Sequence, residues 1–447
     1  MSLSRVLIAN RGEIAVRVIR SCRVMGIETV LAASEADRDS LGARLADRTV
    51  IIGPPYASTY LNIANIVQAA LVTGADAVHP GYGFLAENAE FAGACRDQGL
   101  VFIGPRAEHI RLMGNKLAAR ALARECGVPV LAGSEKTGSY EEALGAVGEI
   151  GFPVMLKAAA GGGGRGMKII TEADKDRLQS IFQEASAEAS AAFGDGTLYM
   201  ERYITRARHI EVQVLGDRFG NAVHLGERDC STQRRHQKLI EEAGAPSISE
   251  ELRQGLYESA VRLVKNISYE NAGTVEFVVD QDEGKYYFLE MNTRIQVEHP
   301  VTEMITGIDL VREQISVAKG EKLPFAQEDV AFSGHAIECR INAEQPEAGF
   351  RPTPGTITRW EAPGGPGIRL DTHCFPGYQA PVFYDSLIAK LIAHGPDRDQ
   401  ALKRMLGALD EFVVEGLSTT IPFLRKLLQS RDFAEGLVHT RLVELTQ

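Results

Sequence analysis

Residues 288–300 read FLEMNTRIQVEHP, and polar side chains alternate with apolar ones through the first part of this stretch. Alternation predicts a strand, and it places Glu290 and Asn292 on one face because successive side chains in a strand point to opposite faces. Carboxylate and amide oxygens are the hard ligands that Mg²⁺ prefers. Arg294 and Glu298 follow in the predicted exit loop. The stretch therefore predicts metal, anion and base chemistry side by side.

A second strand is predicted upstream at residues 274–279, and the turn-rich DQDEG segment joins it to residues 285–291. Two strands connected in this way form an antiparallel hairpin. The hairpin brings a further carboxylate, Glu276, towards the polar face of the second strand.

The register of this hairpin decides how close the two carboxylates lie. If Val279 pairs with Lys285, Glu276 lies opposite Phe288 and diagonal to Glu290, about 7 Å apart on one face. That spacing lets the two carboxylates bridge cations. A solvated hairpin face is the alternative interpretation.

The composition is that of a globular α/β protein. The chain has 447 residues, of which 45% are hydrophobic and 24% are charged, and it has 44 glycines. This length exceeds one ordinary core and predicts two or three domains. The net charge of -11 argues against non-specific nucleic-acid binding, which usually requires a basic excess. Any anion site must therefore be local.

The cysteines and the apolar segments favour the cytoplasm. Six cysteines are scattered along the chain without a Cys-x-x-Cys pair, which is typical of reduced structural thiols. The N-terminus has too short an apolar stretch for a secretory signal. The uncharged run 58–75 contains Asn62, Asn65, Gln68 and Thr73, so we expect a packed helix there rather than a membrane span.

The first hundred residues predict a parallel β-α-β unit. Residues 5–9 and 27–33 read as strands, and Ile14, Val18, Cys22 and Met25 recur between them at helical spacing. The first turn, Asn10-Arg11-Gly12, lacks the glycine pattern of a dinucleotide fingerprint, so no nicotinamide cofactor is predicted.

A glycine-dense loop follows the predicted strand 152–156 and reads KAAAGGGGRGM over residues 157–167. Adjacent glycines expose amides that can lie along phosphate oxygens, while Lys157 supplies a positive charge. The order differs from a Walker A loop, because the lysine precedes the glycines and no hydroxyl residue follows it. A flexible hinge is the alternative interpretation. Lys116 is a weaker phosphate-binding candidate by itself, and the other phosphate-binding candidates in the chain support it.

Three further segments carry polar or basic side chains. Residues 201–204 (ERYI) are typical of a segment that connects a lid to the body, and their backbone can pair with a purine edge. Residues 209–214 (HIEVQV) alternate as a half-buried strand does. Residues 233–238 (QRRHQK) concentrate positive charge in an acidic protein, which favours anion binding over a solvated face.

Together these segments resemble the ATP-grasp superfamily, and more narrowly the biotin carboxylases. The resemblance covers nearly the whole chain and rests on NRGEIA at 10–15, HPGYGF at 79–84, the glycine loop, RRHQK at 234–238, residues 291–300 and GHAIECR at 334–340. Two positions depart from the family pattern. Asn115 stands where the family often has Asp, and Ala159-Ala160 replaces a Ser-Gly before the glycine tract. Neither departure removes a catalytic side chain.

The resemblance implies an α/β and α+β fold with three domains. These are an N-terminal Rossmann-like (pre-ATP-grasp) domain at 1–114, an ATP-grasp domain at 115–330 with a mobile lid at about 131–203, and a C-terminal biotin carboxylase domain at 331–447. Strands expected at 336–341, 355–359 and 387–393, followed by helices from about residue 397, predict a mixed sheet with helical cover for the last domain.

The resemblance also assigns the nucleotide and metal sites. ATP binding is implied for Lys116, Lys157, Gly163, Gly164, Glu201, Arg202, Tyr203, Ile204, His209, Gln233, His236, Glu276 and Glu290. Two Mg²⁺ ions, which Mn²⁺ can replace, are implied on Glu276, Glu290 and Asn292. These residue types suit phosphoryl transfer, which depends mainly on positioning and charge neutralisation.

Bicarbonate and biotin are assigned to the segment after the hairpin and to two cations. The implied substrate-binding residues are Lys238, Arg294, Gln296, Val297 and Arg340, and the implied catalytic residues are Arg294, Glu298, Lys238 and Arg340. Glu298 matches the base that deprotonates bicarbonate for attack on the γ-phosphate, and we expect its pKa to be raised or its geometry enforced. The implied product is carboxyphosphate, whose CO₂ is captured by a biotin enolate that Arg340 stabilises. A buried structural ion pair is the alternative interpretation of Arg340.

The biotin itself is expected on another polypeptide. Carrier domains present biotin on a lysine in a Met-Lys-Met context, whereas the only Met-Lys of this sequence is Met167-Lys168. No extension of carboxyltransferase length is present either. We therefore expect a stand-alone, homodimeric subunit of acetyl-CoA carboxylase in fatty acid synthesis, working with a biotin carboxyl carrier protein and carboxyltransferase subunits. An excised domain of a longer enzyme, and propionyl-CoA, pyruvate or other acceptors, stay open.

Two rival functions are weighed against this expectation. Another ATP-grasp ligase, which joins a carboxylate to an amine through an acyl phosphate, shares the ATP-binding parts but does not need Arg294 to Glu298 and Arg340. A non-catalytic nucleotide-binding subunit is expected to have lost Lys238, Glu298 or Arg340, and the sequence retains all three.

Overall fold

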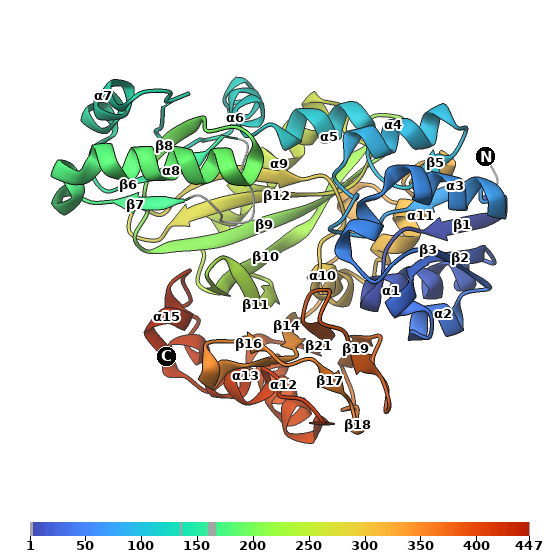
Figure 1. Cartoon of the computed structure of the whole chain (residues 1–447). Coiled ribbons are helices and arrows are strands. Elements are labelled where there is room, and N and C mark those ends of the chain that lie inside the picture. The colour runs from blue at the N-terminus through green and yellow to red at the C-terminus, as the bar shows by residue number, and fades with distance from the viewer. Residues whose placement is uncertain (1–2, 135, 160–166, 447) are drawn as a thin grey trace.

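The computed structural model describes residues 3–134, 136–159 and 167–446 and arranges them around one long, twisted sheet (Figure 1). The N-terminal residues, in blue, form a compact α/β domain at one end of this sheet. The C-terminal residues, in orange and red, extend the sheet and cover it with helices. This arrangement confirms the expected combination of a parallel α/β domain with α+β parts.

The N-terminal domain is built on a five-stranded parallel sheet in the order β3-β2-β1-β4-β5. The predicted β-α-β opening is confirmed, and Ile14, Val18 and Cys22 are buried on the inner face of the helix. The elements are β1 (Arg5–Ile8), α1 (Gly12–Val24), β2 (Glu28–Ser34), α2 (Leu41–Leu45), β3 (Arg48–Gly53), α3 (Ile63–Thr73), β4 (Ala77–His79), α4 (Ala89–Asp97), β5 (Val101–Phe102) and α5 (Ala107–Gly114).

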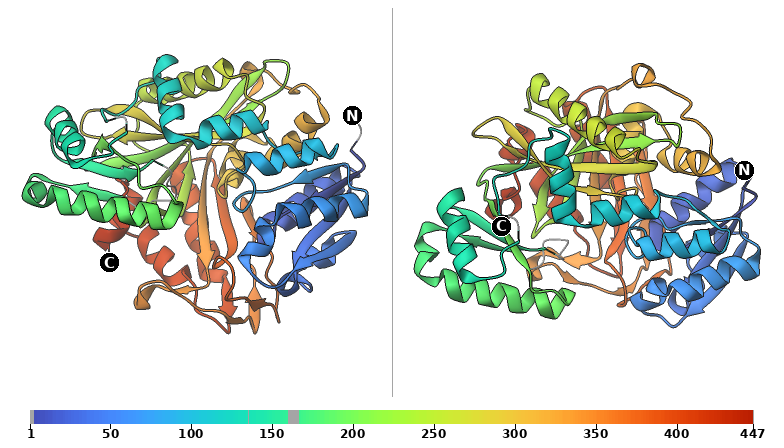
Figure 2. Two further views of the ribbon diagram at one scale, coloured as in Figure 1. Left: turned by 45° about the horizontal axis from the view of Figure 1, so that its top comes forward. Right: turned by 90° about the horizontal axis from the view of Figure 1, so that it is seen from above.

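A small antiparallel sheet, ordered β7-β6-β8, forms the core of a separate segment between residues 131 and 203. Both views in Figure 2 place this segment, in teal and green, on the far side of the long strands from the N-terminal domain. Its elements are α7 (Tyr140–Ile150), β6 (Val154–Ala158), β7 (Lys168–Ile170), α8 (Leu178–Phe193) and β8 (Leu198–Arg202), and α6 (Lys116–Glu125) precedes it.

The long sheet has eight strands in the order β13-β12-β9-β10-β11-β14-β21-β19. Its elements, with the helices that pack on it, are β9 (Ala207–Gly216), β10 (Ala222–Arg234), β11 (Gln237–Ala243), α9 (Glu250–Asn266), β12 (Asn271–Asp280), β13 (Lys285–Asn292), α10 (His299–Thr306), α11 (Leu310–Lys319), β14 (His335–Asn342), β19 (Ile368–Thr372), β21 (Leu387–Gly395) and α12 (Arg398–Glu411). Strand β11 pairs with β14, so one hydrogen-bonded sheet crosses the boundary predicted near residue 331.

The C-terminal part differs from the predicted mixed sheet. Every pairing between its strands in the described part of the chain is antiparallel. The single strand expected at 355–359 is instead two short strands, β17 and β18, which pair with different partners. The remaining elements are β15 (Glu344–Gln345), β16 (Arg351–Pro352), β17 (Gly355–Thr356), β18 (Arg359–Glu361), β20 (Gln379–Ala380), β22 (Val413–Glu415), α13 (Ile421–Leu428), α14 (Arg431–Ala434) and α15 (Leu442–Thr446).

The predicted hairpin is present as β12 and β13, but its predicted register is wrong. Asp280, not Val279, pairs with Lys285, and an irregularity after Glu276 shifts the pairing again. Glu276 therefore lies directly opposite Glu290 rather than diagonal to it. An extra residue of this kind cannot be read from alternation, because a bulge changes the pairing without changing either strand's sequence pattern.

Strand β9 is buried on both faces, whereas residues 209–214 were expected to form a half-buried strand. Glu211 and Gln213 have no exposed surface, although both are polar. They are covered because β9 lies inside the sheet and its polar face points into a charged interior.

No helix in the described ranges combines the length and the apolar character that are needed to cross a bilayer. The uncharged run 58–75 contains α3, whose residues Ile66, Val67, Ala69 and Ala70 are buried against the N-terminal sheet. The packed helix expected there is confirmed.

Candidate active site

A cleft of about 1840 Å³ lies between the N-terminal domain, the 131–203 segment and the long sheet. The loops after β1 and β4 line one side of it, as expected for the carboxyl ends of parallel strands. The sequence-predicted residues that line it are Lys116, Lys157, Glu201, Arg202, Tyr203, Ile204, His209, Gln233, His236, Lys238, Glu276, Glu290, Asn292, Arg294, Gln296, Val297 and Arg340. Gly163 and Gly164 lie outside the described residues. Glu298 does not line the cleft.

The carboxylate of Glu298 lies beneath two cations that face the cleft. Its Oε1 atom is 2.5 Å from Nζ of Lys238, and its Oε2 atom is 2.9 Å from Nη2 of Arg340. The Glu298 side chain has no exposed surface. The two cations therefore separate the predicted base from the cleft.

Charge, not burial, sets the protonation state of Glu298. Burial by itself raises a carboxyl pKa, but Lys238, Arg340 and Arg228 together lower the pKa of Glu298 well below its ordinary range. We expected a raised pKa or an enforced geometry, and the structure shows an enforced geometry. The predicted base is deprotonated but held in two ion pairs.

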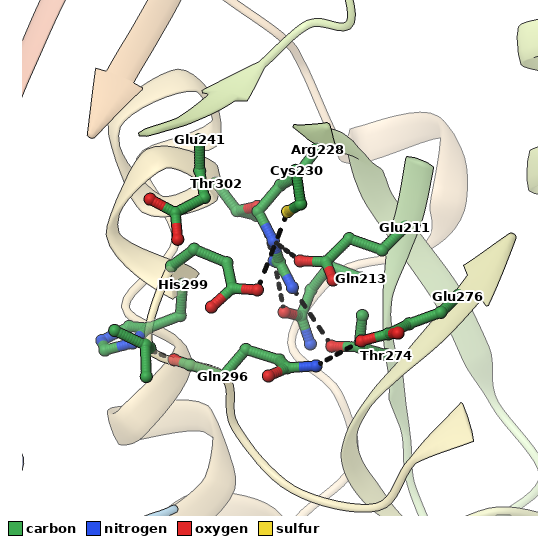
Figure 3. Close-up of polar contacts among 12 residues, drawn as sticks. Glu211, Gln213, Arg228, Cys230, Glu241, Thr274, Glu276, Gln296, His299 and Thr302 are labelled. Carbon is green, nitrogen blue, oxygen red and sulfur yellow. Dashed lines mark hydrogen bonds and ion pairs between the residues drawn. The ribbon is translucent and has the colours of Figure 1, made fainter. Parts of the chain in front are cut away.

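A second layer of buried polar residues supports this pair, and sequence reasoning missed it. Figure 3 shows Glu211 and Gln213 directed at the guanidinium of Arg228, with distances of 2.6 Å and 2.7 Å. The other carboxylate oxygen of Glu211 is 2.7 Å from Nζ of Lys238. The available signal was the alternation in residues 209–214, which predicted a polar face without showing that the face is buried.

Arg340 is shared between two carboxylates. Its Nη2 atom lies 2.5 Å from Oε1 of Glu241 as well as 2.9 Å from Glu298. Burial raises the pKa of Glu241 to about 7 even beside this guanidinium. Arg340 thus makes the buried ion pair that the alternative interpretation proposed, and it also lines the cleft.

Arg294 is held by neighbours on its own segment and by one residue of the N-terminal domain. It donates to Oε1 of Gln296 at 2.9 Å and to Oδ1 of Asn292 at 3.0 Å. Its Nε atom donates to Glu87 at 2.8 Å. The sequence analysis predicts no role for Glu87. The structure shows that Glu87 holds the Arg294 guanidinium at the cleft.

The predicted metal ligands converge at the β12–β13 hairpin. Glu276 and Glu290 are directly opposite each other, and Nδ2 of Asn292 donates to Oε1 of Glu276 at 2.7 Å. Lys116 lies 3.4 Å from Glu290, whose side chain is 34% exposed to the cleft. Two carboxylates and an amide at a half-open position form a hard-oxygen donor set, which fits Mg²⁺.

Two other groups of potential ligands lie close together among the described residues. They are His209 with Glu211 and Glu276, and Glu211 with Cys230 and Glu298. Lys238 contacts Glu211, Glu276 and Glu298, at 2.7, 3.4 and 2.5 Å. This ammonium group explains why the carboxylates approach one another, so these clusters give no reason to propose a further metal.

All four residues of the segment 201–204 line the cleft. The Glu201 side chain pairs with Lys157 of β6 at 2.5 Å and with Arg120 of α6. The N–H groups of Arg202 and Tyr203 donate to backbone carbonyls at 2.9 Å. The N–H of Ile204 has no acceptor among the described residues.

The basic run 233–238 forms the tight turn between β10 and β11. Arg235 and His236 occupy the turn with φ values of 48° and 65°. Left-handed backbone is unusual for residues other than glycine and is often found at functional sites. The turn exposes Arg235 and His236 at the cleft and leaves Lys238 to enter the interior.

Three family profiles match consecutive parts of the chain. They are the biotin carboxylase N-terminal domain at residues 2–110, the carbamoyl-phosphate synthase L chain ATP-binding domain at 115–326, and the biotin carboxylase C-terminal domain at 338–445.

Relatives and a solved structure agree with these matches. The chain is 52% identical to biotin carboxylase 1 of Bacillus subtilis over 99% of this chain and 98% of that protein. It is 50% identical to a pyruvate carboxylase component of Methanothermobacter thermautotrophicus over 99% of this chain and 89% of that protein. The biotin carboxylase domain dimer of Hydrogenobacter thermophilus 2-oxoglutarate carboxylase, in complex with MgADP, ADP and bicarbonate, has a TM-score of 0.96 and 48% identity over 100% of this chain and 98% of that one.

Proposed function

This chain belongs to the biotin carboxylase family and is an ATP-dependent ligase. We propose which carboxylase it serves and which step each site residue carries out. It carboxylates biotin on a separate carrier protein, with bicarbonate as the carbon source, as the first half-reaction of acetyl-CoA carboxylase. The observation that carries the proposed roles is the clamp of Lys238 and Arg340 on the two oxygens of Glu298.

The nucleotide end of the cleft binds ATP. Lys116 and Lys157 supply positive charge for the phosphates, and the family resemblance adds Gly163 and Gly164, which lie outside the described residues. His236 is exposed at the cleft, and Gln233 lines the cleft although it is largely buried. The N–H of Ile204 has no acceptor among the described residues. These groups suit contacts along the rest of the nucleotide. His209 lies 3.0 Å from Glu276, and this carboxylate outweighs the effect of burial and raises the pKa of His209.

Glu276, Glu290 and Asn292 would hold the magnesium ions. When bound, Mg²⁺ neutralises phosphate charge during transfer. Lys116 lies 3.4 Å from Glu290, so a magnesium ion would compete with Lys116 for this carboxylate, and the phosphates of ATP would compete with Glu290 for Lys116. The amide of Asn292 donates an N–H to Glu276 and accepts from Arg294 through Oδ1, so it would offer this oxygen to a metal after rotating.

Bicarbonate binds between Lys238, Arg294, Gln296 and the backbone of Val297. The planar guanidinium of Arg294 is fixed by Glu87 and matches a planar anion. As Lys238 turns towards the bicarbonate, its charge leaves Glu298. The pKa of Glu298 then rises, because the largest positive contribution that lowers it is withdrawn.

Glu298 then takes the proton of bicarbonate, and the resulting oxyanion attacks the γ-phosphate of ATP with loss of ADP. The product is carboxyphosphate, which breaks down to CO₂ and phosphate. The phosphate removes the ureido proton of biotin. Arg340 stabilises the enolate that captures CO₂, since its guanidinium reaches the cleft and is held in place by Glu241.

The acceptor of the carboxyl group is set by a different subunit. The relatives include components named for pyruvate and 2-oxoglutarate carboxylation as well as biotin carboxylases. Pyruvate carboxylation is therefore the second candidate context. Partners are a biotin carboxyl carrier protein and carboxyltransferase subunits, and a homodimer is supported by the dimer in the 2-oxoglutarate carboxylase structure. All six cysteines are free and buried, which suits the reducing cytoplasm.

Two measurements test the proposal. Incorporation of labelled bicarbonate into free biotin, with ATP and magnesium, tests the half-reaction, and its absence overturns the proposal. Affinity purification of the native partners, followed by an assay with acetyl-CoA, propionyl-CoA, pyruvate and 2-oxoglutarate, tests the acceptor. Carboxylation of pyruvate but not acetyl-CoA would replace the acetyl-CoA carboxylase context with the second candidate.

A further inference from the structure

Lys390 on β21 is a fully buried lysine next to the site. It is the direct cross-strand partner of Arg340 on β14, and the two strands lie side by side in Figure 1. Residues directly opposite each other on neighbouring strands point to the same face of a sheet. Lys390 and Arg340 therefore project together towards the loop that carries Val297 and Glu298. The Lys390 side chain has 0% exposure.

The two neighbouring cations contact two consecutive residues of this loop. Arg340 reaches the carboxylate of Glu298 at 2.9 Å. Lys390 donates from Nζ to the backbone carbonyl of Val297 at 2.7 Å. A charged donor makes a stronger hydrogen bond than a neutral one, particularly away from water. The sheet thus fixes both the side chain of the base and the backbone just before it.

A buried ammonium group also needs a compensating charge, which comes from the N-terminal domain. Glu13, on α1, places its Oε1 atom 3.2 Å from Nζ of Lys390. The hydroxyl of Tyr82 donates to the same oxygen. On the other neighbouring strand, Asp371 lies opposite Lys390 but is bound to Arg369 at 2.8 Å. Glu13 is therefore the carboxylate in direct contact with Lys390, and Glu338, diagonal to Lys390 on β14, adds a second buried acidic group near it.

We propose that Lys390 is a positioning residue of the carboxylation reaction, which holds the Val297 backbone so that the bicarbonate site and Glu298 keep their relative placement. This inference rests on the proposed roles of Val297 and Glu298. Lys390 does not touch the substrate. It acts through the Val297 carbonyl and makes the geometry of the loop depend on Glu13 of the N-terminal domain.

A purely structural ion pair is the competing explanation of Lys390. In that case the ammonium group would serve to neutralise Glu13, and its closest contact would be with that carboxylate. The shorter contact is with the Val297 carbonyl, at 2.7 Å compared with 3.2 Å for Glu13. The geometry therefore favours a role at the loop.

Lys390→Met tests the proposal, because methionine keeps the length of the side chain and removes the donor. The assay measures ATP hydrolysis against bicarbonate concentration at saturating ATP, magnesium and free biotin. We expect kcat/KM for bicarbonate to fall about tenfold to a hundredfold, the loss expected for one hydrogen bond from a charged donor. The KM for ATP is expected to stay at the wild-type value, since Lys390 does not contact the nucleotide end of the cleft.

Arg253→Met is the matched control. Arg253 also pairs with a buried carboxylate, Glu227, but does not contact residues 296–298. It should lose thermal stability while its bicarbonate kinetics stay at the wild-type value. A Lys390→Met protein that is less stable but has wild-type kcat/KM for bicarbonate would overturn the positioning role.

Glu13→Gln provides a second variant if Lys390→Met does not fold. It weakens the hold on Lys390 without removing the Val297 contact, so kcat/KM for bicarbonate should fall by a smaller factor than expected for Lys390→Met. Unchanged bicarbonate kinetics in Glu13→Gln would count against the proposal. If hydrolysis by the wild-type enzyme does not depend on bicarbonate, the proposed function fails, and the variants are not the cause.

Discussion

Lys238 approaches Oε1 of Glu298 to 2.5 Å although sixty residues separate them in the chain. This contact joins the end of the β10–β11 turn to the loop before α10. The ammonium group pairs with the predicted base and lowers the pKa of Glu298. The following predictions derive from this arrangement and from the charged groups around it.

Glu298→Gln should abolish turnover while ATP still binds. Glutamine keeps the shape of the side chain but cannot accept a proton from bicarbonate, so kcat should fall by about a hundredfold or more. The measurements are bicarbonate-dependent ATP hydrolysis and calorimetric titration with ATP. Undiminished activity in this variant would refute the role of Glu298 as the base.

Free biotin should raise the rate of ATP hydrolysis, and only when bicarbonate is present. Arg340 now binds Glu298 and Glu241, and a bound biotin gives it a third partner at the cleft. Four assays, with each substrate alone, both or neither, check this expectation. Hydrolysis that is indifferent to both substrates would discard the biotin carboxylase activity.

Glu290→Gln should raise the magnesium concentration needed for half-maximal activity by about tenfold or more, because a charged oxygen ligand is replaced by a neutral one. Titration of activity with magnesium, after removal of metal with a chelator, measures the effect. Glu258→Gln on the exposed surface of α9 is the control and should titrate as the wild type does. Identical curves for Glu290→Gln and the wild type would exclude Glu290 as a metal ligand.

The buried carboxylate of Glu242 should make thermal stability depend on pH. Burial opposes its charge, but His335 and Arg398 lower its pKa from 4.5 to about 2. A carboxyl group with a lowered pKa stabilises the folded state fully above pH 4.5, and this contribution is lost as pH falls towards 2. The contribution at neutral pH is about 3 kcal/mol.

Glu242→Gln is the test of this linkage. The melting temperature of the variant should lie below that of the wild type at pH 7, and the gap should narrow as the pH is lowered below 4.5. Glu250→Gln, at the exposed start of α9, should show no such gap. A constant difference between Glu242→Gln and the wild type at all pH values would contradict the assigned pKa.

Much of the site was predictable because its residues are close in sequence. Glu290, Asn292, Arg294 and Gln296 share one strand and its exit loop, and the structure places all of them at the cleft. The roles of these residues and the domain boundaries at 114 and 330 stay predictions. The glycine loop lies outside the described residues, so its phosphate contacts also stay a prediction.

The partners of these residues were not predictable from local patterns. Glu211 lies on a strand that was predicted to be half-buried, and no role was predicted for Arg228 or Glu241. Only the assembled sheet shows that the charged ends of these residues are buried together. The register of the hairpin was not predictable either. The irregularity after Glu276 depends on how both strands pair, and one strand's pattern does not show it.

The sequence by itself determined which chemical groups are present, on which strands and turns they lie, and which of them share a face, because backbone sterics act between neighbouring residues. The tertiary structure decided the protonation state of Glu298, the burial of Glu211 and the position of Lys390 beneath Val297. These properties depend on charges brought together from distant parts of the chain in a medium with little water. The combined electrostatic effect of these charges cannot be read from the spacing of residues along the sequence.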